Sequence, residues 1–250
     1  MDNLRISTIT NVLKVSENID LNKIYNSIPI TEYIPFIEYG DGNIPKGFSE
    51  KALRKKRKKK KKRIFYNQAT LHVIHDGKIM NVKLFNNGRI QITGLKKENQ
   101  GGELVRGLLD YLSDFSIFDK DIHITNNKIV LINSDFDIGY EIKRETLHNE
   151  IINYGMYSTY ETCIYPGVNI KYYINTNNCD GICKCTSICN GKGNGNGDGD
   201  CKKVTIAVFK SGKIIITGGQ NKDQIETSYR FIKNFIEGKK QKFILKYEMV

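Results

Sequence analysis

Apolar and polar residues alternate in two similar segments of the chain, and each pattern predicts a β-hairpin. Residues 84–94 read LFNNGRIQITG, and residues 208–218 read VFKSGKIIITG. Six of the eleven positions are identical, and the two copies are a constant 124 residues apart. In both copies a β-rich run meets a two-residue turn with Gly at its end, and an alternating run then ends in Thr-Gly. The pattern indicates a duplicated structural unit.

An amphipathic helix is predicted after each hairpin, because apolar residues recur there with helical spacing. The apolar faces of these two helices consist of Leu104, Val105, Leu108, Leu109 and Leu112, and of Ile225, Tyr229, Ile232 and Ile236. Upstream of the hairpins, residues 6–15 and 128–138 are typical of strands, and short helices follow around 20–27 and 144–153. Strands followed by an amphipathic helix, twice, predict an α+β protein with its helices on one face of a sheet.

Two segments do not fit the repeat. Residues of about 38–63 are polar and then purely basic, and residues of about 176–202 are dominated by Asn, Gly, Cys and Asp. Neither segment has enough apolar side chains to fold by itself, so we interpret both as insertions. The predicted organisation is a first repeat over 1–115 and a second repeat over 116–250, with one insertion in each.

The net charge of +12 is concentrated in one place. Residues 51–63 hold 11 of the 39 basic residues and no acidic residue, whereas the rest of the chain has 28 basic and 27 acidic residues. The total charge therefore does not show that the folded part binds DNA. A solvated loop is the simplest interpretation of the basic tract, with a nuclear-import signal and a nonspecific DNA clamp as alternatives.

Several classes of protein are disfavoured by the sequence. No apolar stretch approaches the ~18 residues of a membrane span, and the first ten residues lack the layout of a secretory signal. We expect a soluble intracellular protein that has no membrane partner. No nucleophile motif, catalytic carboxylate cluster or dinucleotide fingerprint occurs, which favours a binding protein over an enzyme.

Five of the six cysteines are crowded into residues 179–201. Cys179, Cys183, Cys185 and Cys189 have a C-x3-C-x-C-x3-C layout, with Cys201 beyond them. Thiolates at this density can bind zinc tetrahedrally, but the spacing is not that of a C-x2-C pair. We expect a reduced, flexible insertion without a cofactor, and zinc bound by these four cysteines is the alternative.

The duplicated hairpins resemble those of TATA-box-binding proteins (TBPs), whose two repeats each contain Phe-x-x-Gly-Lys-hydrophobic-x-x-Thr-Gly. Both copies match this motif, with Arg89 in place of Lys in the first. The segment 160–167, YETCIYPG, is similar to the family's Tyr-Glu-Pro-Glu-Leu-Phe-Pro-Gly, with Tyr165 at the Phe position. The resemblance covers most of the chain outside the insertions. It implies a saddle of two pseudo-symmetric repeats, with a curved antiparallel sheet and helices on its convex face.

The resemblance also implies three sets of DNA-binding residues. The aromatic wedges that enter base steps would be Phe65, Phe85, Tyr165 and Phe209. The groove surface would consist of Thr8, Thr10, Gln91, Thr93, Asn133, Ile215 and Thr217, and the phosphate contacts would be Arg89, Lys96, Lys171 and Lys213. The family has an Asn in the first strand of each repeat, where Thr8 and Leu131 stand here. Leu131 cannot donate a hydrogen bond, so we expect an altered sequence preference at the centre of the DNA site.

The function that the resemblance implies is that of a general transcription initiation factor, which binds the minor groove of A·T-rich promoter DNA and bends it. Its protein partners would be a B-type initiation factor and RNA polymerase, and the chain itself would be a monomer or weak dimer. The nucleus is the expected location, or a viral factory or virion if the source is a large DNA virus. The alternatives are a paralogue that acts as a protein scaffold in transcription, and the nucleic-acid-binding module of a nuclease.

Overall fold

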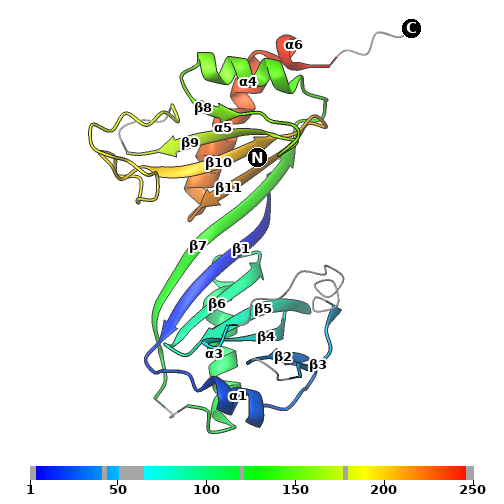
Figure 1. Ribbon diagram of the computed structural model, residues 1–250, viewed down its shortest axis with the longest axis vertical. Coiled ribbons are helices and arrows are strands. Elements are labelled where there is room, and N and C mark those ends of the chain that lie inside the picture. Colours follow the sequence, from blue (N-terminus) through cyan, green and yellow to red (C-terminus); the bar gives the residue numbers. More distant parts are fainter. Residues whose placement is uncertain (1–3, 41–43, 51–64, 119–120, 177–179, 246–250) are drawn as a thin grey trace. The chain divides into compact units, whose positions relative to one another are not determined.

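The computed structural model describes residues 4–40, 44–50, 65–118, 121–176 and 180–245 (Figure 1). The chain divides into two compact units. The first unit is Thr8–Val130, and the second unit is Leu131–Val250 together with Met1–Ser7. Two long strands cross these boundaries and contribute to both units. The basic tract, residues 54–63, lies outside the described residues.

The first unit has a sheet backed by a helix. Its elements in chain order are β1 (Arg5–Val15), α1 (Leu21–Ser27), β2 (Phe36–Glu38), β3 (Lys46–Gly47), β4 (Gln68–His75), β5 (Lys78–Phe85), β6 (Arg89–Leu95) and α3 (Gln100–Ser113). The strand order is β3-β2-β4-β5-β6-β1, and every neighbouring pair is antiparallel. Helix α3 contacts β6, and all five residues of its predicted apolar face are buried.

The second unit repeats this arrangement. Its elements are β7 (Ile124–Asp137), α4 (Arg144–Asn153), β8 (Tyr157–Thr159), β9 (Val168–Ile174), β10 (Lys202–Val208), β11 (Lys213–Gly219), α5 (Lys222–Gly238) and α6 (Lys240–Phe243). The strand order is β7-β11-β10-β9-β8 (Figure 1). Helix α5 packs on β10 and β11, and its four predicted core residues are buried. The α+β class and the antiparallel sheet predicted from the sequence are confirmed.

Both hairpin turns have the same geometry. The N–H of Gly88 donates to the carbonyl of Phe85, and the N–H of Gly212 donates to that of Phe209, each at 3.1 Å. The φ angles of the two glycines are +80° and +84°. Glycine adopts this left-handed region at no steric cost. Three residues connect the strands in the first copy and four in the second. The predicted two-residue turn is therefore wrong: both loops are longer and end in a left-handed Gly.

The predicted first insertion begins inside the sheet. Glu38 belongs to β2, which pairs with β4, and Lys46–Gly47 forms β3 on the outer side of β2. The hydroxyl of Ser49 is hydrogen-bonded to Nδ1 of His72, which is only 1% exposed. The prediction that this segment does not fold is therefore wrong for its described residues. Backbone pairing to an existing sheet edge orders these polar residues without a core of their own.

The second insertion is also folded in its described part. Residues 180–201 connect β9 to β10 and hydrogen-bond to both strands. The N–H of Tyr173 donates to Gly181 at 2.8 Å, and the N–H of Lys203 donates to Gly191 at 2.7 Å. Asp198 accepts hydrogen bonds from Thr186 Oγ1 and from the N–H of Ser187. The expectation of a flexible insertion is wrong here, because polar cross-links replace the apolar core that the segment lacks.

Among the helices in the described part of the chain, none is long and apolar enough to cross a membrane.

Candidate nucleic-acid interface

The sheet of the second unit has one face packed on helices and one open face. On β11, Ile214 and Ile216 are fully buried under α5, whereas Ile215 is 37% exposed and Thr217 is half-buried. Successive side chains of a strand point to opposite faces, so Ile215 and Thr217 lie together on the open face. This is the surface that the sequence analysis expected to contact base edges.

Two aromatic rings meet at the end of this open face. Tyr165 and Phe209 are in T-shaped contact, with ring centroids 5.7 Å apart. Gly167 makes the contact feasible, because a Cβ at this position would lie 3.0 Å from the ring of Tyr165 and 3.3 Å from that of Phe209. Tyr165 is 38% exposed and Phe209 is half-buried. Neither ring is packed beneath the helices, so the structure brings together the two residues expected to form one wedge pair.

A groove of about 860 Å³ runs beside this aromatic pair. It is lined by Arg5, Ser7, Asp135, Phe136, Asp137, Phe209, Ser211, Lys213 and Ile215. The guanidinium of Arg5 donates from Nη2 to both carboxylate oxygens of Asp135, at 2.8 and 3.1 Å. The ion pair neutralises a carboxylate on a face that would otherwise repel phosphate.

The middle of the open face is held by cross-strand hydrogen bonds. Thr217 Oγ1 donates to Asn133 Oδ1 on β7, and Lys171 Nζ donates to Thr205 Oγ1 at 3.0 Å. Burial and then the neighbouring Lys203 lower the pKa of Lys171. Lys171 therefore lies within the face, half-buried, and its ammonium is less well solvated than an exposed lysine's.

The first unit has an equivalent open face on β5, β6 and β1. Thr10 pairs with Thr93, and Thr93 pairs with Asn81, while Gln91 lies two residues before Thr93 on the same face. Gln91 and Thr93 are half-buried, but Thr10 is only 7% exposed. The buried Oγ1 of Thr8 has no hydrogen-bond partner in the structure. Hydroxyl and amide groups thus line this face, as expected, although Thr10 offers little surface.

The second pair of expected wedges is arranged differently. Phe85 ends β5, opposite Gln68 at the start of β4, and Phe65 precedes β4 by three residues. Phe65 is 56% exposed and Phe85 is half-buried. Within the described residues the structure has no contact between these two rings. Both lie at the same end of the β4–β5 hairpin without forming a pair like that of Tyr165 and Phe209.

The outer strands of the two units are unequal. Strand register makes His72 on β4 equivalent to Lys171 on β9, and Phe36 on β2 equivalent to Tyr157 on β8. Phe36 is 7% exposed and its ring lies tilted against that of His72, with ring centroids 4.8 Å apart. Tyr157 is 60% exposed. The open face is therefore covered at its outer strands in the first unit and exposed there in the second.

The remaining basic residues that were expected to contact phosphate are at the surface. Arg89, Lys96 and Lys213 are all exposed. Arg89 pairs across the strands with Lys14, whereas Lys213 pairs with Asp137. Two cations therefore lie side by side on β6 and β1 in the first unit, whereas on β11 and β7 in the second unit a cation lies beside a carboxylate.

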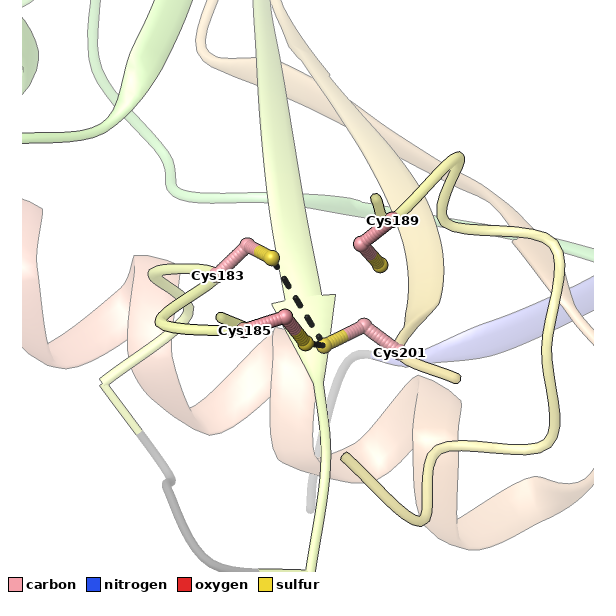
Figure 2. Close-up of side chains that lie close together, drawn as sticks. All are labelled: Cys183, Cys185, Cys189 and Cys201. Atoms are coloured by element: carbon pink, nitrogen blue, oxygen red, sulfur yellow. Dashed lines mark hydrogen bonds between the residues drawn. The ribbon is translucent and has the colours of Figure 1, made fainter. Parts of the chain in front are cut away.

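The cysteines gather into one cluster in the second insertion. The sulfurs of Cys183, Cys185, Cys189 and Cys201 all lie within 4.8 Å of one another (Figure 2). Cys179, which the sequence analysis placed in the candidate zinc set, lies outside the described residues, and Cys201 takes part instead. The sequence signal was present, since Cys201 was the one cysteine of this segment beyond the regular spacing.

Three comparisons with known proteins find similarity to TBPs in sequence or in fold. The family model described as "Transcription factor TFIID (or TATA-binding protein, TBP)" matches residues 126–238. A "TATA-box-binding protein-like" protein of Acanthamoeba polyphaga mimivirus is 29% identical over 259 residues, covering 92% of this chain and 64% of that protein. The structure of Methanococcus jannaschii TBP matches 94% of this chain and 99% of its own, with a TM-score of 0.57 and 17% identity. In its second repeat by sequence, and over nearly its whole length by fold, the chain is similar to TBPs.

The matches differ in what they cover. The family model matches the second repeat, from β7 to α5, whereas the archaeal TBP matches the fold of nearly the whole chain. At 17% identity that structural match is evidence of fold alone. The chain spans less than two thirds of the mimivirus protein's length.

Sequence reasoning missed the ion pair of Arg5 with Asp135. The two residues are 130 positions apart, and no motif connects them. One signal was available: Asp135 lies two residues after Asn133 on a predicted strand, and therefore on the same face. Two further polar residues of the sheet were not predicted. Thr205 accepts the hydrogen bond from Lys171, and the buried Oδ1 of Asn169 has no hydrogen-bond partner in the structure.

Proposed function

We propose that the chain is a TBP-like transcription initiation factor that places the open faces of its sheet on the minor groove of A·T-rich promoter DNA and bends the duplex. The exposed ring pair of Tyr165 and Phe209, at the end of an open sheet face, is the observation that supports this most directly. These rings pack on each other and not beneath a helix, and accessible rings on a sheet face stack on bases in nucleic-acid-binding proteins.

The chemistry of the open faces suits A·T base pairs. In the minor groove, A·T pairs show only acceptors, whereas G·C pairs add the guanine amino group. Gln91, Thr93 and Thr217 offer hydroxyl and amide groups, and Ile215 offers an exposed apolar side chain. This surface can follow the groove floor of A·T pairs and is obstructed by the guanine amino group.

Insertion of the aromatic pair between base pairs would bend the duplex. Unstacking a base step with a side-chain wedge costs a few kcal/mol. The larger protein contact that bent DNA allows offsets this cost, and TBPs are themselves an example. Tyr165 and Phe209 would insert at one end of the site. Phe65 and Phe85 would act at the other end, where the absence of ring contact between them leaves each ring to insert separately.

Cations at the rim of the faces would hold the phosphates. Arg89, Lys96 and Lys213 are exposed and would fix the register of the protein on the duplex. Lys171 lies within the face, and its lowered pKa reflects a poorly solvated ammonium for which a phosphate would be a favourable partner. These contacts would make binding salt-dependent without selecting a sequence.

A structured surface beside α4 is the proposed contact for a B-type initiation factor and RNA polymerase. Arg144 lies over the ring of Tyr160, 5.2 Å from its centroid, and also donates to the carbonyl of Pro166. The segment 160–167 is thereby fixed against α4 while Ile164 stays 79% exposed. We place the factor in the nucleus, or in a viral factory, and as a monomer or weak dimer.

Bending of a TATA duplex tests the proposal. The full chain is mixed with a duplex that carries a donor and an acceptor dye at its two ends, and energy transfer is measured. Transfer is expected to rise on binding, and to rise little with a duplex in which G·C pairs replace the A·T pairs. Binding with no change in the end-to-end distance would overturn the proposal and favour a protein scaffold.

The variant Arg5→Ala tests the electrostatics of the open face. Without the guanidinium, Asp135 faces the phosphates as an uncompensated carboxylate. We expect DNA affinity at low salt to fall about three- to tenfold, in keeping with the ~1 kcal/mol of an exposed ion pair. Fluorescence anisotropy on a TATA duplex measures the change. Arg230→Ala, on the exposed side of α5, is the matched control and should bind like the unmodified chain.

A double variant separates neutralisation from direct contact. Arg5→Ala combined with Asp135→Asn removes the uncompensated charge and is expected to recover most of the lost affinity. If the double variant binds as weakly as Arg5→Ala alone, Arg5 acts on the DNA itself and not through Asp135.

A further inference from the structure

The loop between β9 and β10 brings four thiols to one point. Cys183, Cys185 and Cys189 come from the loop itself, and Cys201 directly precedes β10. Cys201 is fully buried and the other three are half-buried. Figure 2 shows the sulfurs of Cys183 and Cys185 beside that of Cys201, with Cys189 nearby on another part of the loop. A cluster that closes a loop onto a strand in this way has the layout of a structural metal site.

The distances fit one tetrahedral ion. Cys185 Sγ and Cys201 Sγ are 3.3 Å apart, Cys183 Sγ and Cys201 Sγ are 3.8 Å apart, and all four sulfurs lie within 4.8 Å of one another. Four sulfurs bound at about 2.3 Å to one tetrahedral zinc are about 3.8 Å apart. We propose that Cys183, Cys185, Cys189 and Cys201 bind a single zinc ion as a closed four-thiolate site.

Hydrogen-bond donors surround the sulfurs. Asn175 Nδ2 donates to Cys201 Sγ at 3.6 Å. The backbone N–H of Gly199 donates to the sulfur of Cys185. Donors of this kind orient metal ligands and stabilise thiolate charge in structural zinc sites.

An ion would add to the stability that the loop gains from its polar cross-links. Its backbone approaches the sheet closely at glycines: a Cβ at Gly191 would lie 2.6 Å from Cβ of Lys203, and one at Gly181 would lie 2.4 Å from the ring of Tyr172. Residues 180–201 are otherwise mostly polar or Gly, with Ile182 and Ile188 as the two large apolar side chains, and Ile188 is completely exposed. Metal binding supplies folding free energy directly where a segment lacks a hydrophobic core.

Disulfides account for the cluster less well than a metal does. Cys183, Cys185, Cys189 and Cys201 are all free thiols in the structure. A disulfide holds two sulfurs at about 2.05 Å, and two bridges would divide the cluster into separate pairs. One ion explains why all four sulfurs share a common centre.

The site is distant from the aromatic pair of Tyr165 and Phe209. The loop joins the strands where Ile174 pairs with Lys202, and the aromatic pair lies at the other end, where Val168 pairs with Val208. Six residues of β-strand separate the two ends, about 20 Å. The ion would therefore stabilise the β9–β10 connection and take no part in contacting base steps.

Metal analysis of the full-length chain, purified without chelators, tests the proposal. We expect about one zinc per chain, and almost none in Cys185→Ser or Cys189→Ser, which are partly exposed and leave the buried position intact. Cys201→Ser should lose the ion as well. Protein loaded with Co²⁺ should show the absorption of a tetrahedral tetrathiolate site, a readout independent of DNA binding.

Two control variants make the test specific. Cys163→Ser, exposed and outside the cluster, should keep the zinc. Cys179→Ser should also keep it, whereas its loss there would contradict the assignment of Cys201 as the fourth ligand. Reduced chain without bound metal, bound iron in place of zinc, or disulfides found by mass spectrometry of the unreduced chain would each overturn the proposal.

Discussion

Replacing both rings of the second unit, Tyr165→Ala with Phe209→Ala, is expected to abolish bending of a TATA duplex and to weaken binding about 100-fold. Each aromatic–base stacking contact contributes about 1–3 kcal/mol, and the pair acts on one base step. Both rings are accessible on the open face, 38% exposed for Tyr165 and half-buried for Phe209. Their removal opens no cavity beneath the helices, so the loss should be one of function and not of folding.

Energy transfer across a dye-labelled duplex measures the bend, and anisotropy measures the affinity. Each single variant should show a partial loss, because the partner ring remains. Ile152→Ala, 49% exposed on α4, removes a similar apolar surface from the helical layer and should leave both quantities unchanged. A double variant that still bends DNA like the unmodified chain would exclude these rings as wedges.

The largest expected effect on stability is that of Gly88→Ala in the first hairpin turn. A Cβ at Gly88 would lie 2.3 Å from the carbonyl oxygen of Glu17 and 3.2 Å from that of Val15. The residue also has a φ of +80°, which costs an L-residue about 1–2 kcal/mol. Relieving this overlap would displace the turn and break the hydrogen bond that the N–H of Val15 donates to the carbonyl of Gly88. We expect a total loss of about 3 kcal/mol or more in unfolding free energy.

Gly77→Ala is the matched control for this variant. Gly77 also has a positive φ, +67°, but a Cβ there meets nothing within 4 Å. Its cost should be that of the backbone conformation alone, about 1–2 kcal/mol. Urea unfolding followed by circular dichroism compares the two. Equal losses in both variants would show that the close approach of Glu17 contributes nothing.

The elements that sequence reasoning located correctly are those set by local periodicity. The apolar face from Leu104 to Leu112 and that from Ile225 to Ile236 both lie in the core. Alternation within each hairpin separated Ile90 and Ile214, which are fully buried, from Gln91 and Ile215 on the other face. Hydrophobic periodicity and turn residues are local properties of the sequence, and a motif that occurs twice supports the same prediction twice.

Features that depend on contacts between distant residues were not predicted. Arg5 and Asp135 meet only because β1 and β7 lie in one sheet. Cys201 joins the cluster because β10 returns to the end of β9, a consequence of strand pairing that no spacing rule contains. The strand at Lys46–Gly47 forms because a sheet edge is available for it, although its own residues do not favour a strand.

The unequal outer strands would affect the orientation in which a DNA duplex binds. A duplex of A·T pairs looks nearly the same from both ends, so two identical half-sites on a protein would bind it equally well in either orientation. Here Phe36 is buried, whereas its counterpart Tyr157 is exposed and accessible to a ligand. A difference of only about 1.4 kcal/mol between the two orientations would favour one of them tenfold. An imbalance of that size would fix the orientation in which a bound duplex lies on the protein.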